Sequence, residues 1–331
     1  MPAAFLFRRS IAAPLCFALF AECGFAASAD PASDYPNRPV RLIVPFVPGA
    51  GTDTTGRAIA AKLSERWGHQ VVVDNRTGAA GSIGVELTRQ ASPDGYTLCL
   101  ISASHTVSVA TNPKLPYDLT RDLQGISQAT SLFYVVYVNP SVPASSIKEL
   151  VAHAKANPNK LNYGSSGTYG LQHFAGELLQ HLSGAKLTHI PYKGGAAVIQ
   201  EVLGGSLQIG FGTLLSLRAH FNSGRLRPLA VSTSKRQPSA PELPTVAESG
   251  VPGYEVDQWY GIITSAKVPR PLIQKLYTGI SESLKSPDIA KRFGAEGSIP
   301  VGSTPEQFNK HIAAEIAKWR KLVKEANIQL N

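Results

Sequence analysis

Four loops that combine glycine with hydroxyl residues carry the groups that could bind a ligand. Each loop follows a strand-like run and precedes a helical pattern; the loops are residues 45–53, 75–84, 163–170 and 191–196. Ligands of open α/β sheets bind beyond the carboxyl ends of strands, where glycine lets the backbone approach them closely. Unpaired N–H groups at the start of the following helix bind anions without a cationic side chain. The loops therefore predict a site for a small anion.

Main-chain amides and hydroxyls are sufficient for such a site on energetic grounds. A hydrogen bond to a charged group contributes about 1.5–3 kcal/mol, so four or five contribute roughly 6–15 kcal/mol before ordering and desolvation costs. Micromolar binding needs about 8 kcal/mol. The third and fourth loops hold hydroxyls that could add donors: Ser165, Ser166, Thr168 and Tyr192. A small carboxylate fits this donor set.

The signatures of enzymes are weaker. Gly49-Ala50-Gly51 resembles the start of a dinucleotide fingerprint, but Thr54 stands at the third glycine position, although Asp74 ends the next strand where a ribose-binding acid belongs. A nicotinamide-dependent oxidoreductase is therefore the main enzymatic alternative. The third loop lacks the glycine at 168 that a nucleophile elbow needs, and no histidines have metal-ligand spacing. We expect no catalytic residue, no metal and no cofactor, and we expect Asp53 to cap its helix and pair with Arg57.

Strand-like and helical patterns alternate along the chain. The expected strands are residues 40–46, 70–74, 96–101, 133–138, 161–164, 187–192, 207–211, 229–233 and 260–264. The expected helices are residues 54–67, 147–156, 172–182, 196–203, 271–284 and 305–326. This alternation predicts an α/β fold with mostly parallel sheets, and nine strands favour two sheets over one. The runs 133–138 and 260–264 are the candidate crossings between them.

The first 29 residues have the features of an export signal. Arg8 and Arg9 precede a short apolar run, and Ala27-Ser28-Ala29 is a small-x-small site, which predicts cleavage before Asp30. The two arginines leave open whether export uses the general or the twin-arginine route. Cys99 is then the single cysteine that remains, and its apolar run predicts a core residue rather than a reactive thiol.

Composition excludes several classes of protein. Of the 331 residues 43% are hydrophobic and 17% charged, which is too apolar for a disordered chain and too poor in charge for a long coiled coil. No stretch reaches the ~18 consecutive apolar residues of a membrane span. The net charge of +9 is scattered rather than gathered in a basic block, so we expect no nucleic-acid partner.

Nine short motifs in order resemble the Bug family, the solute receptors of tripartite tricarboxylate transporters. The motifs are YPNRP (35–39), PGAGTD (48–53), NRTGAAG (75–81), PDGYTL (93–98), LPYD (115–118), YGSSG (163–167), PYKGG (191–195), PTVAESG (244–250) and WYG (259–261). The resemblance implies an exported, non-catalytic type II periplasmic-binding-protein fold with a hinged cleft between two α/β lobes. One lobe would comprise residues 30–131 and 254–331, and the other residues 132–253. The receptor would capture a small organic carboxylate and give it to the permease subunits in the membrane.

The resemblance also implies where the ligand binds. The first lobe would contribute the first loop, and Ser104 would line another wall; these residues are Phe46, Gly49, Ala50, Gly51, Thr52, Asp53 and Ser104. The opposite lobe would contribute Ser165, Ser166, Thr168, Tyr169, His173, Tyr192, Gly194 and Ala196. Ala50 departs from the family pattern, which usually has glycine there. We expect a valine at position 51 to occupy ligand space and abolish binding without unfolding the protein.

Two points stay open at this stage. The liganded receptor could dock on a membrane sensor kinase instead of a permease, since both roles would use the same site. The ligand could be a dicarboxylate, a tricarboxylate, an aromatic acid or an amino acid.

Overall fold

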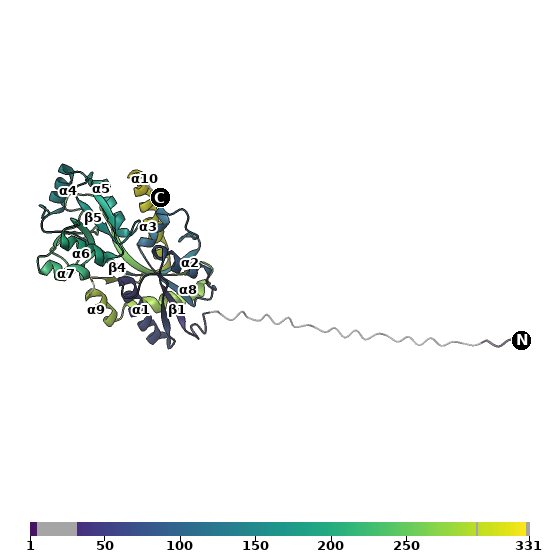
Figure 1. The fold of residues 1–331 in the computed structure, drawn as a ribbon. Helices are drawn as coiled ribbons and strands as arrows, with labels where there is room; N and C mark the ends of the chain where they lie inside the picture. Colours follow the sequence, from purple (N-terminus) through teal and green to yellow (C-terminus); the bar gives the residue numbers. More distant parts are fainter. Residues whose placement is uncertain (5–31, 296, 329–331) are drawn as a thin grey trace. The chain divides into compact units, whose positions relative to one another are not determined.

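Two groups of parallel strands, connected by two longer antiparallel strands, form the framework of the protein (Figure 1). The computed structural model describes residues 1–4, 32–295 and 297–328. The expected export signal, apart from its first four residues, and its cleavage site lie outside the described residues.

The first group has β1 (Val40–Val44) at its centre. Strand β1 pairs in parallel with β2 (Val71–Asn75) on one side and β3 (Thr97–Ser102) on the other. These strands are short and rich in valine, isoleucine and leucine because helices cover both of their faces. Strand β9 (Asp257–Ser265) pairs antiparallel with β3, and β4 (Leu123–Val138) pairs antiparallel with β9.

The second group uses the other half of β4. There β4 pairs antiparallel with β7 (Ile209–Thr213) and β8 (Arg227–Val231), and β5 (Asn162–Ser165) lies in parallel between β7 and β6 (Thr188–Pro191). The short β10 (Ile299–Pro300) pairs with β4. Strand β4 therefore belongs to both groups, as expected for the run 133–138. The α/β fold class is confirmed, while the residue boundaries of the two lobes stay a prediction. The expectation of two separate sheets is wrong, because β4 pairs with strands of both groups and joins them into one ten-stranded sheet.

The helices surround these strands. They are α1 (Gly51–Trp67), α2 (Ser82–Gln90), α3 (Ser104–Thr111), α4 (Ile147–Ala156), α5 (Leu171–Ser183), α6 (Gly195–Gly204), α7 (Leu214–Asn222), α8 (Arg270–Leu284), α9 (Pro287–Ala295) and α10 (Pro305–Glu325). A short 3-10 helix, Ala79–Gly81, precedes α2. All six expected helices are present, and α2, α3, α7 and α9 were not expected.

Helix α10 ties several elements together. Its expected capping box is present: the Thr304 side chain accepts from Gln307 N, and the Gln307 side chain accepts from Thr304 N. Its apolar stripe is buried, and Trp319 packs edge-on against Phe174 of α5 with ring centroids 5.8 Å apart. Figure 1 shows α10 beside α3, and the two helices are in contact.

The core leaves no reactive thiol among the described residues. Cys99 is fully buried in β3, and burial raises the pKa of its thiol to about 12, as expected for a structural cysteine. No helix within residues 1–4, 32–295 and 297–328 is both long and apolar enough to cross a membrane.

Candidate ligand-binding cleft

A cavity of about 520 Å³ lies between the ends of the two strand groups. From the first group and the connecting strands it is lined by Phe46, Ala50, Gly51, Thr52, Tyr134, Gln258 and Tyr260. From the second group it is lined by Ser166, Gln172, Gly195, Ala196, Ile199, Gln200, Phe211, Gly212, Thr213, Ser216 and His220. Its volume is that of a pocket for a small organic molecule.

The first loop is fixed by a carboxylate behind it. Gly49 has φ +83°, a conformation that favours glycine, and its N–H donates to Asp53 Oδ2 at 2.9 Å. The same oxygen accepts from Arg57 Nε at 2.9 Å, and Asp53 Oδ1 accepts from Asn75 Nδ2 at 2.9 Å. Burial disfavours the ionised Asp53, but these hydrogen bonds outweigh it and hold the pKa of the carboxyl below its usual value. Asp53 therefore positions the loop and has its oxygens engaged.

The pairing of Asp53 with Arg57 is confirmed, but the expectation that Asp53 caps its helix is wrong. The N-cap residue of α1 is Ala50, which has no side chain that can cap, and Asp53 lies within the first turn. Its carboxylate reaches back to the N–H of Gly49, one residue before the N-cap, because the left-handed backbone at Gly49 turns that N–H toward it.

Gln172 fixes the opposite wall. Its Oε1 accepts from Ser166 N at 2.7 Å, and its Nε2 donates to the carbonyl of Phe211 at 2.7 Å. The third loop is thereby tied to the end of β7. Both polar groups of this buried amide are engaged, so Gln172 shapes the wall more than it offers a donor.

Three helices begin at the cavity without a capping side chain. The N-cap residues of α1, α6 and α7 are Ala50, Gly194 and Thr213, and none accepts a hydrogen bond from its helix. Ser146 caps α4 and Thr304 caps α10, both away from the cavity, while α2, α3, α5 and α8 also begin without a capping side chain. The first-turn N–H groups of α1, α6 and α7 are therefore not engaged by N-cap side chains, and they carry the positive end of the helix dipole.

Hydroxyls and rings complete the lining, and fixed charges are missing from it. Burial, with a contribution from neighbouring Tyr260, raises the pKa of the Tyr134 phenol, so this phenol stays neutral at ordinary pH. The Phe46 ring lies edge-on to His105 with centroids 5.5 Å apart. Among the described residues that line the cavity there is no aspartate, glutamate, lysine or arginine, and His220 is the one imidazole.

A model of the family described as the tripartite tricarboxylate transporter family receptor matches residues 55–328. The chain belongs to this family. It is 35% identical over 312 residues to protein BugT of Bordetella pertussis, which covers 94% of this chain and 95% of that protein. Members of the family are periplasmic binding proteins and not enzymes, so the chain is a solute-binding receptor and the oxidoreductase alternative is excluded.

Solved structures of similar proteins have the same fold. The structure of R. palustris Rpa4515 with adipate has a TM-score of 0.79 and 33% identity, covering 89% of this chain and 99% of that one. The periplasmic binding protein BugD has a TM-score of 0.78 and 29% identity, with coverages of 89% and 99%. The resemblance to the Bug family is therefore confirmed, and with it the type II periplasmic-binding-protein fold.

Six residues expected to bind the ligand line the cavity of this receptor. They come from both walls: Phe46, Ala50, Gly51, Thr52, Ser166 and Ala196. Each of them stands where a strand ends and a helix begins, and their contact with a ligand stays a prediction.

The other nine expected residues do not line this cavity: Gly49, Asp53, Ser104, Ser165, Thr168, Tyr169, His173, Tyr192 and Gly194. Several lie one layer behind it. The His173 ring stacks on His189 with centroids 3.8 Å apart, its Nδ1 accepts from Tyr169 N at 3.2 Å, and Ser165 Oγ lies 2.7 Å from His189 Nε2. Burial and the neighbouring His173 lower the pKa of His189 to about 4. These groups hold the third loop, and their contact with a ligand stays a prediction.

The residues that sequence reasoning missed come mainly from the connecting strands and β7. Tyr134 lies on β4, Gln258 and Tyr260 lie on β9, and Phe211 lies on β7. Gln258 is 7% exposed, and its Oε1 has no hydrogen-bond partner among the described residues. One sequence feature could have identified these residues. The runs 133–138 and 260–264 were expected to cross between the two halves of the fold, and residues at such a crossing face the space between the halves.

The structure changes the reason for expecting Gly51 to be essential. A Cβ at this position would lie 2.8 Å from the hydroxyl oxygen of Tyr260, too close for that ring to keep its place. Tyr260 is buried in β9. A larger residue at 51 therefore acts by displacing a wall of the cavity as well as by occupying space in it.

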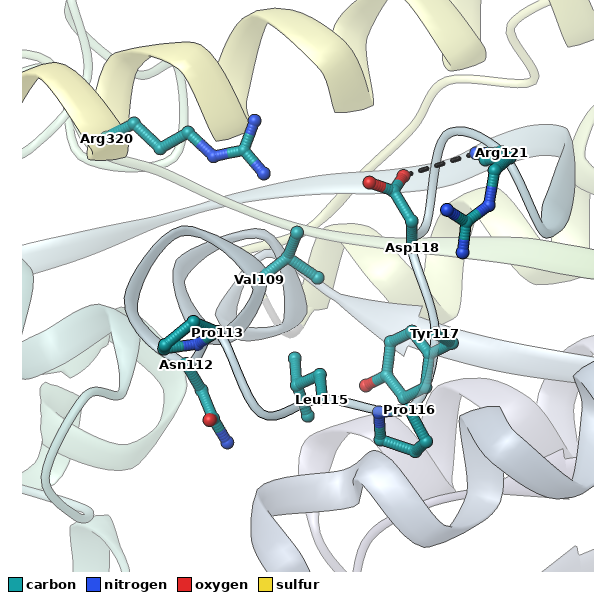
Figure 2. A pocket seen from close by; sticks show the side chains of 9 residues that line it. All are labelled: Val109, Asn112, Pro113, Leu115, Pro116, Tyr117, Asp118, Arg121 and Arg320. Atoms are coloured by element: carbon teal, nitrogen blue, oxygen red, sulfur yellow. Dashed lines mark hydrogen bonds between the residues drawn. The ribbon is translucent and has the colours of Figure 1, made fainter.

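A second hollow of about 250 Å³ lies on the outer face, between the segment after α3 and helix α10 (Figure 2). It is lined by Val109, Asn112, Pro113, Leu115, Pro116, Tyr117, Asp118, Arg121 and Arg320. Unlike the cleft, it has three charged side chains, and Figure 2 shows Arg320 reaching toward it from α10. No residue expected to bind the ligand lies there.

The described residues supply no metal site, and the candidate ribose-binding acid is engaged in ion pairs. No group of three or more histidine, cysteine, aspartate or glutamate side chains among them could hold a metal ion. Asp74, the candidate ribose-binding acid, pairs with Arg41 at 2.6 Å and with Arg76 at 3.0 Å.

Proposed function

We propose that this receptor captures a small organic carboxylate in the cleft and delivers it to the membrane permease of a tripartite transporter. The observation that carries the proposal is the convergence of three helix starts without capping side chains on one cavity that contains no acidic side chain. An anion is the ligand such a lining stabilises, because N–H dipoles and hydroxyl donors meet it from both walls.

The balance of free energies supports a carboxylate. Each hydrogen bond from an amide or hydroxyl to a charged oxygen contributes about 1.5–3 kcal/mol, which must offset the loss of water from the carboxylate. Donors that are already fixed lose little conformational freedom on binding. The Asp53 and Gln172 side chains fix the two walls in this way.

The relatives support the same class of ligand. The R. palustris protein Rpa4515 was solved with adipate, a carboxylate. Its 33% identity over most of both chains makes a shared mode of capture the simplest proposal for this receptor.

The arrangement of the strands in two groups would allow the receptor to close around its ligand. The carboxylate enters between the strand groups, the loop donors replace its water, and the groups close by bending of β4 and β9, which connect them. The closed form then presents a surface to the permease that combines both lobes. We also propose that residues 1–29 direct export and are removed before Asp30, which places the receptor in the periplasm.

A thermal-unfolding screen tests the proposal. Protein purified from the periplasm is heated with organic acids and, as matched controls, with their uncharged primary amides. A ligand present at about 100 times its Kd adds about 2.7 kcal/mol to the free energy of unfolding, so the binding acid should raise Tm by several degrees while its amide does not. Equal shifts with acid and amide, or no shift with any acid, would contradict carboxylate binding.

Delivery has its own test. Cells that carry the permease subunits should take up the acid identified in the screen only when the receptor is present. Uptake that is unchanged after deletion of the receptor would contradict the transport role.

A further inference from the structure

A buried glutamine in the wall of the cleft has an oxygen without a partner. Gln258 lies on β9, lines the cavity and is 7% exposed, and its Oε1 accepts no hydrogen bond from any described residue. Resting on the proposed function, we infer that Gln258 is a specificity-determining residue of the receptor. Its Oε1 accepts a hydrogen bond from a hydroxyl or amino group on the carbon chain of the carboxylate ligand.

A second glutamine of the same cavity provides the comparison. Gln172 is also 7% exposed, but its Oε1 accepts from Ser166 N and its Nε2 donates to the carbonyl of Phe211. A buried amide oxygen that stays unpaired costs free energy, and native proteins contain few such groups. Gln172 therefore serves the wall itself, whereas the oxygen of Gln258 is an acceptor that a ligand in the cavity can satisfy.

On one side, Gln258 is close to the start of α1. Gln258 and Tyr260 are two residues apart on β9, so their side chains share a face and are separated by about 7 Å along the strand. Trp259 between them points to the other face, where it packs edge-on against Phe308. Tyr260 marks the start of α1, because a Cβ at Gly51 would lie 2.8 Å from its hydroxyl oxygen.

On the other side, Gln258 is close to the start of α7. Gln258 is opposite Leu132 of β4, and two residues further along β4 Tyr134 is opposite Thr213, the N-cap residue of α7. Gln258 therefore lies between two helix starts that lack capping side chains. If the carboxylate binds at either of them, the next part of the ligand lies beside Gln258.

The amide of Gln258 can turn its oxygen toward the ligand. Oε1 is out of contact with solvent in this structure, and no hydrogen bond from a described residue holds it there. The last torsion of a glutamine side chain is soft, so a turn about it brings the oxygen to the cavity that the residue lines. A ligand donor then satisfies the oxygen, while an unsubstituted chain leaves it unpaired.

Isothermal titration calorimetry with acids that differ by one substituent tests the inference. The reference is glutarate; 2- and 3-hydroxyglutarate add a hydroxyl, L-glutamate adds an amino group, and 2-oxoglutarate adds an acceptor. We expect at least one of the three acids with a donor to bind about 10- to 100-fold more tightly than glutarate, and 2-oxoglutarate to bind no more tightly than glutarate. The set of 3-phenylpropanoate, 3-phenyllactate, L-phenylalanine and phenylpyruvate repeats the comparison on an aromatic body.

Variants of Gln258 connect this preference to the residue. Gln258→Met has a similar length but no amide oxygen, so the affinity ratio of the preferred acid to its unsubstituted parent should fall to within about 2-fold of unity. Gln258→Glu keeps an acceptor, so it should weaken every acid by repulsion and still keep the preference. Gln70→Met is the matched control, because Gln70 is exposed and outside the cleft lining, and it should leave the ratio unchanged. Circular dichroism establishes that the variants fold, and a ratio measured within one protein cancels any general loss of affinity.

The outcomes separate this inference from the proposed function. If no acid with a donor binds more tightly than its parent, or if the oxo acids bind most tightly, the inference is wrong while carboxylate capture stands. If Gln258→Met keeps the preference, another residue recognises the substituent and the inference fails. The inference also fails if the thermal-unfolding screen finds a ligand and none of these acids binds. If no acid of any class binds, the proposed function fails and the inference with it.

Discussion

The cleft and the outer hollow of Figure 2 differ in how they use charge. The hollow is lined by Arg121, Arg320 and Asp118, and two of these side chains, Arg121 and Asp118, are engaged by neighbouring groups of the protein. Arg121 binds Asp122 through two hydrogen bonds of 2.8 and 2.9 Å, and Asp118 Oδ1 accepts from Thr120 N, Thr120 Oγ1 and Arg121 N. The cleft has no such charges in its lining and keeps main-chain donors at three helix starts.

This difference between paired side-chain charges and main-chain donors indicates which region can bind an anion. Side-chain charges that pair within the protein gain little from a further ion and hold the local chain in place. Donors that have no internal partner gain the full hydrogen bond when a ligand arrives. The cleft is therefore the better anion site, although the arginines lie at the hollow.

The two regions also differ in the groups that titrate behind them. Burial lowers the pKa of His105, next to Phe46, to about 4 and keeps the imidazole neutral. At the hollow, the hydrogen bond from Arg121 leads the causes that lower the pKa of Asp122 to about 2 and keep the carboxylate charged. As the pH falls, His105 behind the cleft should therefore gain a proton well before Asp122 at the hollow does.

The largest predicted effect is this loss of stability in mild acid. Because the unfolded His105 has an ordinary pKa of ~6.5, the unfolded chain binds a proton between about pH 6.5 and 4 that the folded protein rejects. Stability is therefore lost as the pH falls through this window, by about 2–3 kcal/mol for His105. Urea unfolding of the native receptor and of His105→Gln at about pH 7.5 and 4.5 measures the loss. The variant should lose about 2–3 kcal/mol less, while both proteins keep the share of His189, whose pKa is also lowered to about 4.

Asp257 also titrates in this range of pH, and its contribution must be separated from that of His105. Burial raises its pKa to about 6, so its contribution has the opposite sign: it stabilises the protein in acid and is lost as the pH rises through 6. This contribution is the same in the native receptor and in His105→Gln, so it cancels in their difference. An equal pH dependence of both proteins would contradict the role of His105.

The next largest effect is the loss of binding in Gly51→Val. The added side chain meets the Tyr260 hydroxyl and moves a wall of the cleft, so we expect at least about 100-fold weaker binding of the acid, or about 2.7 kcal/mol. Gly204→Val is the matched control, because a Cβ at Gly204 meets no atom within 4 Å. Calorimetry on both variants should show the loss in the first alone; unchanged affinity in Gly51→Val would remove the first loop from the site.

Features that depend on a local pattern of residues could be predicted from the sequence. The parallel strands and the glycine loops could be predicted, because continuous apolar runs and strand-to-helix turns are local patterns. Loop residues such as Gly51 and Ser166 were found for this reason. The first half of β4 was missed because polar residues, among them Gln124, Ser127 and Gln128, interrupt its apolar pattern.

The rest of the cleft depends on contacts between distant segments. Tyr134 and Tyr260 line the cavity because β4 and β9 pair antiparallel where the strand groups meet, which no local pattern specifies. His173 does not line the cavity; its ring stacks on the half-buried His189, and its contact with a ligand stays a prediction. That partner is 16 residues away and belongs to another strand.

An intermediate effect comes from adding one negative charge to each region. Gln200→Glu changes no shape but places a carboxylate in the lining of the cleft, where repulsion at about 7 Å should weaken anion binding roughly 10-fold. Asn112→Asp makes the same change in the hollow and should leave affinity unchanged. Calorimetry with the same acid compares the two, and equal effects would show that the protein's overall charge rather than the cleft controls binding.

The smallest predicted effect belongs to Arg320. Replacing it with glutamine removes a cation from the hollow but nothing from the cleft, so affinity for the acid should change by less than about 2-fold. A larger loss would mean that the anion binds at, or is attracted through, the outer face. Arg320→Lys, which keeps the charge, would then separate these two cases.

A crystal structure of the receptor with the acid that binds most tightly tests the central claim most directly. We predict both carboxylate oxygens within hydrogen-bond distance of main-chain N–H groups at the start of α1, α6 or α7, with the rest of the molecule against the rings of Phe46 and Phe211. A carboxylate held by Arg121 or Arg320, or by any lysine or arginine, would contradict it.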